Sequence, residues 1–151
     1  MHRSAKTKTA LRLAAAIVAL TLGACESTRE FAGPSPLRPS QPTAEQTSRL
    51  DAANAAKEAG DYATAMSLFQ AVLSENPTIA TAYLGIGDVY LLTEDYGTAE
   101  PAFSRAARLE PRNYDAQYGH GLALQMLERF VEAIRAYQRA LVIEPESAEA
   151  N

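Results

Sequence analysis

Hydrophobic and small residues recur along residues 46–145 at a spacing of 34 positions. One slot of this pattern is aromatic in each of three copies, at Phe69, Phe103 and Tyr137. Three further slots recur in the same register: Tyr62, Tyr96 and Phe130; Ala65, Ala99 and Ala133; and Pro77, Pro111 and Pro145. Four slots in register over three copies indicate a repeat architecture, in which each copy is one supersecondary unit.

Within each copy the pattern predicts two helices joined by a short turn. In the second copy we expect them at about residues 81–93 and 98–109, with a turn at 94–97. The other turns are expected at residues 60–62 and 128–130. Gly60 can adopt a positive φ at a helix end, and Asp61 and Asp95 can cap the helices that follow. Each closing proline stops a helix, because proline cannot continue the hydrogen-bond ladder.

Small residues mark the places where helix backbones are expected to approach closely. The first helix of each copy has one such slot, held by Ala53, Gly87 and Gly121. The repeated alanine gives the second helix a slot of the same kind, and the repeated aromatic is expected to fill the space between neighbouring helix pairs. Pro101 falls in a predicted first turn, where N–H groups have no helical partner, so we expect the helix to tolerate it.

The pattern resembles the tetratricopeptide repeat, whose period is also 34. The resemblance implies an all-α fold of three repeats and six helices in a right-handed superhelix, with repeats at about 46–79, 80–113 and 114–147. It also implies a protein-interaction module without catalytic activity. The first copy departs most from the family's pattern, with Arg49 in the aromatic slot that Tyr83 occupies in the second copy. A terminal, capping repeat is expected to be atypical.

By the same resemblance, the first helix of each repeat lines a concave groove that binds a partner. The corresponding positions are Leu50, Asn54, Lys57, Leu84, Asp88, Leu91, Asp115, Tyr118, Leu122 and Gln125. Apolar residues and carboxylates are mixed there, so a helix or extended peptide with apolar anchors and some positive charge would suit the groove. The leucines can equally belong to the core between repeats. Leu50, Gly85 and Gly119 occupy positions where chaperone-binding members place polar or basic residues, which argues against a carboxylate clamp.

The last residues of the sequence, 146–151, read like the start of a further first helix. If nothing covers the third copy, the outer face of its second helix exposes Ile134, Leu141 and Val142, and exposed apolar patches tend to mark interaction sites. We therefore expect either end-to-end self-association through this face or a truncated reading frame.

The N-terminus has the layout of an export signal. Residues 1–12 carry four cations and no acid, and residues 13–22 form an apolar run. This run is too short for a transmembrane helix, which needs roughly 20 residues, and it fits a secretory signal. Leu22-Gly23-Ala24-Cys25 resembles the bacterial lipobox. That resemblance implies removal of residues 1–24, acylation of Cys25 and, since Asp does not follow the cysteine, the periplasmic side of the outer membrane. A free cysteine is the alternative.

Residues 25–44 are predicted to be a linker between this anchor and a repeat domain at 45–151. The linker holds four of the eight prolines of the chain. Because proline excludes regular helix, we expect a semi-rigid spacer with a reach of about 60 Å at most.

Composition narrows the classes of function. The chain has 47% hydrophobic and 21% charged residues, as a globular protein does. The first 24 residues hold four of the 14 Lys and Arg and none of the 18 Asp and Glu, so the remainder is acidic. An acidic body disfavours nucleic-acid binding. His2 and His120 stand apart, and neither a metal site nor a cofactor motif is expected. The single cysteine, Cys25, excludes an internal disulfide.

Together these features predict a membrane-anchored, non-catalytic scaffold or adaptor of the bacterial cell envelope. Two narrower alternatives stay open. Lipoproteins of this layout resemble the pilotin-like factors that help a pilus or secretin complex assemble in the outer membrane. A non-catalytic subunit of a cell-wall enzyme complex fits equally well.

Overall fold

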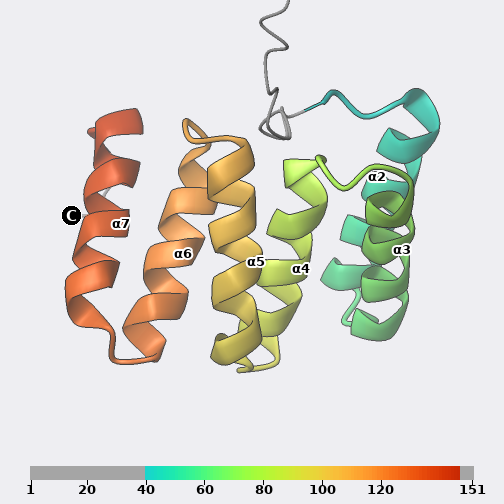
Figure 1. Cartoon of the computed structure of the whole chain (residues 1–151). Coiled ribbons are helices and arrows are strands. Elements are labelled where there is room, and N and C mark those ends of the chain that lie inside the picture. Colours follow the sequence, from blue (N-terminus) through green and yellow to red (C-terminus); the bar gives the residue numbers. More distant parts are fainter. Residues whose placement is uncertain (1–39, 147–151) are drawn as a thin grey trace, which may run out of the picture. The chain divides into compact units, whose positions relative to one another are not determined.

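The computed structural model describes residues 40–146, and in this range it contains six helices and no strand. The helices are α2 (Ala44–Glu58), α3 (Tyr62–Glu75), α4 (Ala80–Leu92), α5 (Tyr96–Leu109), α6 (Tyr114–Met126) and α7 (Phe130–Ile143). They follow one another in chain order as three antiparallel pairs, with α2 and α3 at one end of the row and α7 at the other (Figure 1). The predicted all-α repeat fold is confirmed. The predicted signal peptide, Cys25 and most of the predicted linker lie outside the described residues.

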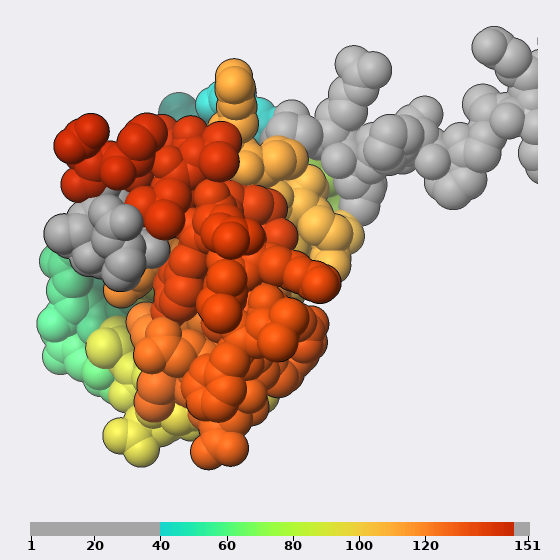
Figure 2. Space-filling view, turned by 90° about the vertical axis from the view of Figure 1, so that its left-hand side faces the viewer, coloured from blue at the N-terminus to red at the C-terminus, as the bar shows by residue number. Residues whose placement is uncertain are grey.

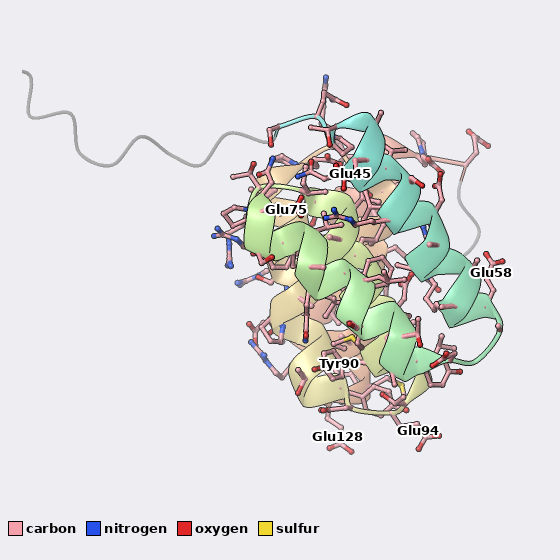
Figure 3. The ribbon with its side chains drawn as sticks, turned by 90° about the vertical axis from the view of Figure 1, so that its right-hand side faces the viewer. Glu45, Glu58, Glu75, Tyr90, Glu94 and Glu128 are labelled. Carbon is pink, nitrogen blue, oxygen red and sulfur yellow. The ribbon has the colours of Figure 1, made fainter. Side chains whose placement is uncertain are left out.

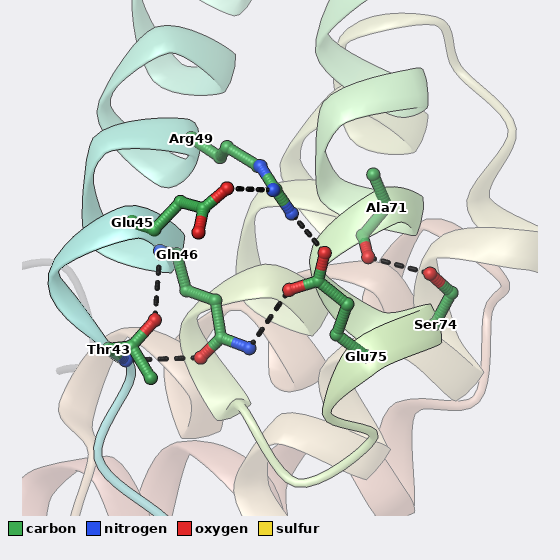
Figure 4. A network of polar contacts seen from close by, with 7 residues as sticks. All are labelled: Thr43, Glu45, Gln46, Arg49, Ala71, Ser74 and Glu75. Atoms are coloured by element: carbon green, nitrogen blue, oxygen red, sulfur yellow. Dashed lines mark hydrogen bonds and ion pairs between the residues drawn. The ribbon is translucent and has the colours of Figure 1, made fainter.

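Local side-chain chemistry starts the helices where the sequence places capping residues. The carboxylates of Asp61 and Asp95 each accept a hydrogen bond from a backbone N–H three residues later, at 3.1 Å. Both predicted caps are confirmed. At α2 the cap is reciprocal: Thr43 accepts from the N–H of Gln46, and the Gln46 amide oxygen accepts from the N–H of Thr43 (Figure 4). Such a capping box satisfies two N–H groups that the helix itself cannot pair.

The turn inside each repeat needs one residue in the left-handed region. Gly60 supplies it in the first repeat with φ of 79°, as predicted. Glu94 and Glu128 take the same place in the other repeats, with φ of 61° and 59°. Both glutamates lie at the same end of the molecule (Figure 3). A side chain in this region clashes with its own backbone and costs about 1 kcal/mol or more, whereas glycine adopts it freely.

Glu94→Gly is therefore expected to raise the free energy of unfolding by roughly 0.5–1 kcal/mol, because it relieves the strained φ. Glu58→Gly is the matched control, since it removes an exposed glutamate from a helix at negative φ and should destabilise by a similar amount. Urea unfolding followed by circular dichroism measures both changes. Equal destabilisation by the two substitutions would contradict this account of the turn.

The repeated aromatic of each second helix packs against glycines of the first helices. A Cβ placed on Gly87 of α4 would lie 2.8 Å from the Phe103 ring, and one on Gly119 of α6 would lie 2.5 Å from it. Phe103 therefore fills the space between two repeats and is 1% exposed. Phe69 packs in the same way against Gly85. The prediction that small residues permit close approach around the aromatics is confirmed at these positions.

Where the repeats depart from the family's aromatic slot, polar pairs join the two helices instead. Arg49 of α2 pairs with Glu75 of α3 (Figure 4), and its guanidinium holds the pKa of the Glu75 carboxyl below its usual value. In the third repeat Gln117 accepts a hydrogen bond from Arg139 at 2.8 Å. The slot thus keeps its role of joining first and second helices while its chemistry changes.

Pro101 lies deeper in its helix than predicted. Helix α5 begins at Tyr96, two residues earlier than expected, which places Pro101 beyond the first turn. Its ring nitrogen cannot donate to the carbonyl of Gly97, four residues earlier. Both residues are exposed, so water can reach that carbonyl. The helix does tolerate Pro101, but because the site is exposed and not because the N–H was dispensable.

Candidate functional site

The first helices of the three repeats enclose an open cavity of about 450 Å³. It lies toward the C-terminal ends of α2, α4 and α6, beside the start of α5. The lining side chains are Lys57, Asp88, Leu91, Leu92, Tyr96, Leu122 and Met126. We call this surface the groove. Since every repeat contributes to it, its shape depends on how the three repeats stack.

A single ion pair spans one wall of the groove. The Lys57 ammonium nitrogen of α2 lies 2.6 Å from a carboxylate oxygen of Asp88 on α4. Both side chains are partly buried, with 18% and 37% of their surface exposed. Because the pair satisfies both charges, Lys57 offers an incoming carboxylate little. The rest of the lining is largely apolar, so the groove is suited to bind apolar side chains.

Four of the ten residues predicted for the groove meet there: Lys57, Asp88, Leu91 and Leu122. The sequence interpretation missed Leu92, Tyr96 and Met126. Leu92 and Met126 end α4 and α6 and are 57% and 46% exposed. They are also 34 positions apart, so the period that located the helices carried a signal for this pair.

Leu50 and Leu84 belong to the core and not to the groove surface. Leu50 is 4% exposed and packs in the cluster that holds Phe69 and Val89. Leu84 packs against the cluster of Phe103 and the alanines that α5 and α6 bring together. The slot points toward the following repeat, whose first helix covers it. For these two leucines the alternative of an inter-repeat core is the correct one.

The remaining predicted groove residues lie elsewhere. Asn54 is half-buried and Asp115 is exposed, and neither lines the cavity. Tyr118 lies 5.6 Å from the ring of Tyr137, measured between centroids. Gln125 accepts a hydrogen bond from the Tyr137 hydroxyl at 2.7 Å. Burial, with a smaller effect of Tyr118, raises the pKa of Tyr137 to about 12, so its hydroxyl stays protonated at neutral pH.

His120 is held by a neighbouring carboxylate. Its Nε2 lies 3.0 Å from Glu100 of α5, while its buried Nδ1 has no hydrogen-bond partner among residues 40–146. Within that range no three His, Cys, Asp or Glu side chains gather in a way that could hold a metal ion. In the same part of the chain, no helix has the length and apolar character needed to cross a bilayer.

Stacked helix pairs around a shared groove define a helical repeat protein. Residues 50–106 and 93–149 both match the tetratricopeptide repeat, and the chain belongs to this family. Repeats of this family typically serve as non-catalytic protein-interaction modules. No curated protein gave a significant match.

Solved structures of similar fold include domains with bound peptides. The tetratricopeptide domain of Arabidopsis OM64 is 24% identical, with a TM-score of 0.66, and the match covers 70% of this chain and 88% of that one. The second such domain of human RPAP3, in complex with the HSP70 peptide SGPTIEEVD, is 23% identical, with a TM-score of 0.66 and coverage of 70% and 88%. MamA of Desulfovibrio magneticus is 28% identical, with a TM-score of 0.64. The match covers 70% of this chain but 59% of that MamA structure.

Proposed function

We propose that this protein is a lipid-anchored, non-catalytic scaffold of the bacterial cell envelope whose groove binds an apolar segment of a partner protein. The observation that carries the proposal is the apolar groove built from all three repeats. Family membership and the peptide complex of a similar fold support a peptide or helix as the ligand. The lipobox-like residues 22–25 support the anchor, and Glu26 supports the periplasmic side of the outer membrane.

The ligand chemistry follows from the groove lining. Leu91, Leu92 and Met126 would receive apolar side chains, whose burial provides most of the binding free energy. Lys57 is engaged by Asp88, so a terminal carboxylate gains little there. The ligand is therefore an amphipathic helix or extended segment with Leu-, Met- or Phe-type anchors, and a cation on it can pair with Asp88.

The groove is tested by comparing proteins retained from gently solubilised envelopes by wild type and by Leu92→Asp. Leu92 is chosen because it is more than half exposed, so the carboxylate enters the groove without entering the core. Val142→Asp is the matched control, since it places the same charge on an exposed position of α7. We expect Leu92→Asp to reduce retention of the partner by at least about tenfold and Val142→Asp to leave it unchanged. Equal retention by all three proteins would remove the groove as the binding site.

The anchor has its own test. Cys25→Ser should move the protein from the membrane fraction to the soluble periplasmic fraction and abolish incorporation of labelled fatty acid, because stable anchoring requires acyl chains. A membrane-bound, unlabelled wild type would refute acylation of Cys25.

Two narrower roles are distinguished by deletion of the gene. Loss of secretin multimers or pili would identify the pilotin-like assembly factor, and co-purification with a cell-wall hydrolase would identify the enzyme subunit. Self-association through the C-terminal end also stays a prediction, and the apolar face of α7 bears on it directly.

A further inference from the structure

Helix α7 carries an apolar stripe that none of the described helices covers. Phe130, Ile134, Tyr137 and Leu141 follow one another at spacings of four, three and four, so they share one face of the helix. We call these four residues the α7 stripe. Phe130 and Ile134 are 58% and 55% exposed. Figure 2 views the molecule from the side on which α7 forms the surface.

The same four slots are covered in the other two repeats. On α3 they are Tyr62, Met66, Phe69 and Leu73, and on α5 they are Tyr96, Glu100, Phe103 and Ala107. All eight are buried or half-buried. Helix α4 covers the first set and α6 covers the second, through Gly85 on Phe69 and Gly119 on Phe103. The α7 stripe is thus a third copy of an interface that the protein forms twice within itself.

The covering helices share a pattern of small residues. Toward the preceding repeat, α4 presents Ala82, Gly85 and Val89, and α6 presents Ala116, Gly119 and Ala123. The central glycine has no freedom to change, because a Cβ there meets the aromatic ring at 2.5 Å or less in both cases. A helix that docks on such a stripe therefore has small residues at positions i, i+3 and i+7, with glycine at i+3.

We propose that the α7 stripe is a second docking surface, which binds a helix of a partner protein with this small-x-x-Gly-x-x-x-small pattern. The partner helix extends the row of helices by one and places its glycine over Tyr137. Tyr118 of α6 borders the surface, in the slot that the following helix covers at Leu50. This surface lies outside the groove lining, so it adds a partner to the proposed scaffold without depending on the groove.

A second copy of this chain does not fit as the docked helix. Its free first helix is α2, and the three slots there are Ser48, Asp51 and Ala55, all exposed. Asp51 stands where the covering helix needs glycine, so docking would press a carboxylate against the Tyr137 ring. Burying a charge without a partner is strongly unfavourable. Asp51 therefore prevents copies from stacking head to tail through α2.

The test uses the full chain, purified in detergent, and a helix-stapled, fluorescein-labelled peptide with the sequence of residues 112–127. This peptide carries the pattern of α6. Fluorescence anisotropy should show binding that Ile134→Asp weakens at least about tenfold, while Val142→Asp and the groove variant Leu92→Asp leave it unchanged. Gly119→Asp in the peptide, which imitates Asp51, should weaken binding equally. Circular dichroism confirms that every protein variant keeps its helix content.

Three results would overturn the proposal. One is the absence of peptide binding up to about 1 mM, and another is binding that Ile134→Asp leaves intact. The third is a concentration-dependent dimer in sedimentation that Ile134→Asp dissolves and the peptide displaces, which would make a second copy the occupant of the stripe. Because Leu92→Asp acts on the groove alone, failure here leaves the groove proposal standing.

Discussion

Phe103→Ala is expected to lower the free energy of unfolding by about 3–5 kcal/mol, the usual cost of emptying a buried phenylalanine site. The ring is 1% exposed and touches glycines of both α4 and α6. Its removal opens a cavity at the contact between the second and third repeats. Domains of this size have about 5–15 kcal/mol of stability in total. Urea unfolding should therefore show a much lower midpoint and, since the third repeat loses its support, a smaller dependence on denaturant.

Tyr137→Ala is the matched control for this prediction. Tyr137 occupies the same slot and packs against Gly121 of its own repeat, but no described helix covers it from the other side. We expect a cost of about 1–2 kcal/mol, because less apolar surface returns to water. If the two substitutions cost the same, the aromatic slot does not join neighbouring repeats in the way the packing indicates.

Gly119→Ala is expected to destabilise the protein by about 1–3 kcal/mol, although alanine favours helix more than glycine does. The added Cβ would lie 2.5 Å from Phe103, closer than non-bonded carbons can approach. Either the ring or helix α6 must then move. Thermal and urea unfolding measure the change.

A second glycine gives the opposite expectation. Gly97 lies in α5 with its nearest neighbouring atom, an Asp95 carboxylate oxygen, at 3.8 Å. Gly97→Ala should stabilise by about 0.5–1 kcal/mol through helix propensity alone. Phe103→Leu should also reduce the cost of Gly119→Ala, since residues in contact are not additive. A stabilising Gly119→Ala would show that the space beside Phe103 is not tight.

Much of the fold could be predicted because its determinants are local or exactly periodic in the sequence. Asp61 and Asp95 cap helices through atoms three residues away, and the glycine slots recur with the aromatics they face. The start of α5 was less certain, since Tyr96 can serve equally in a turn or in a first helical position.

The groove could be predicted only in part, because exposure depends on how closely the next repeat packs. Leu84 and Leu91 have the same composition and both lie on α4, yet α5 and α6 enclose Leu84 while Leu91 borders the groove. Leu92 and Met126 were missed because they end their helices, where family resemblance gives no binding position. The ion pair of Lys57 with Asp88 joins residues 31 positions apart, and no short-range pattern indicates it.

The helices touch only near neighbours in the row: α4 contacts α2, α3, α5 and α6, and no contact joins α2 or α3 with α7 among the described residues. Every contact can therefore form after closing a short stretch of chain, which favours rapid folding. The middle repeat, supported on both sides, is the natural place for a nucleus, from which order spreads outward in either direction. A nascent chain leaving a membrane channel could thus begin to fold before its last repeat has emerged.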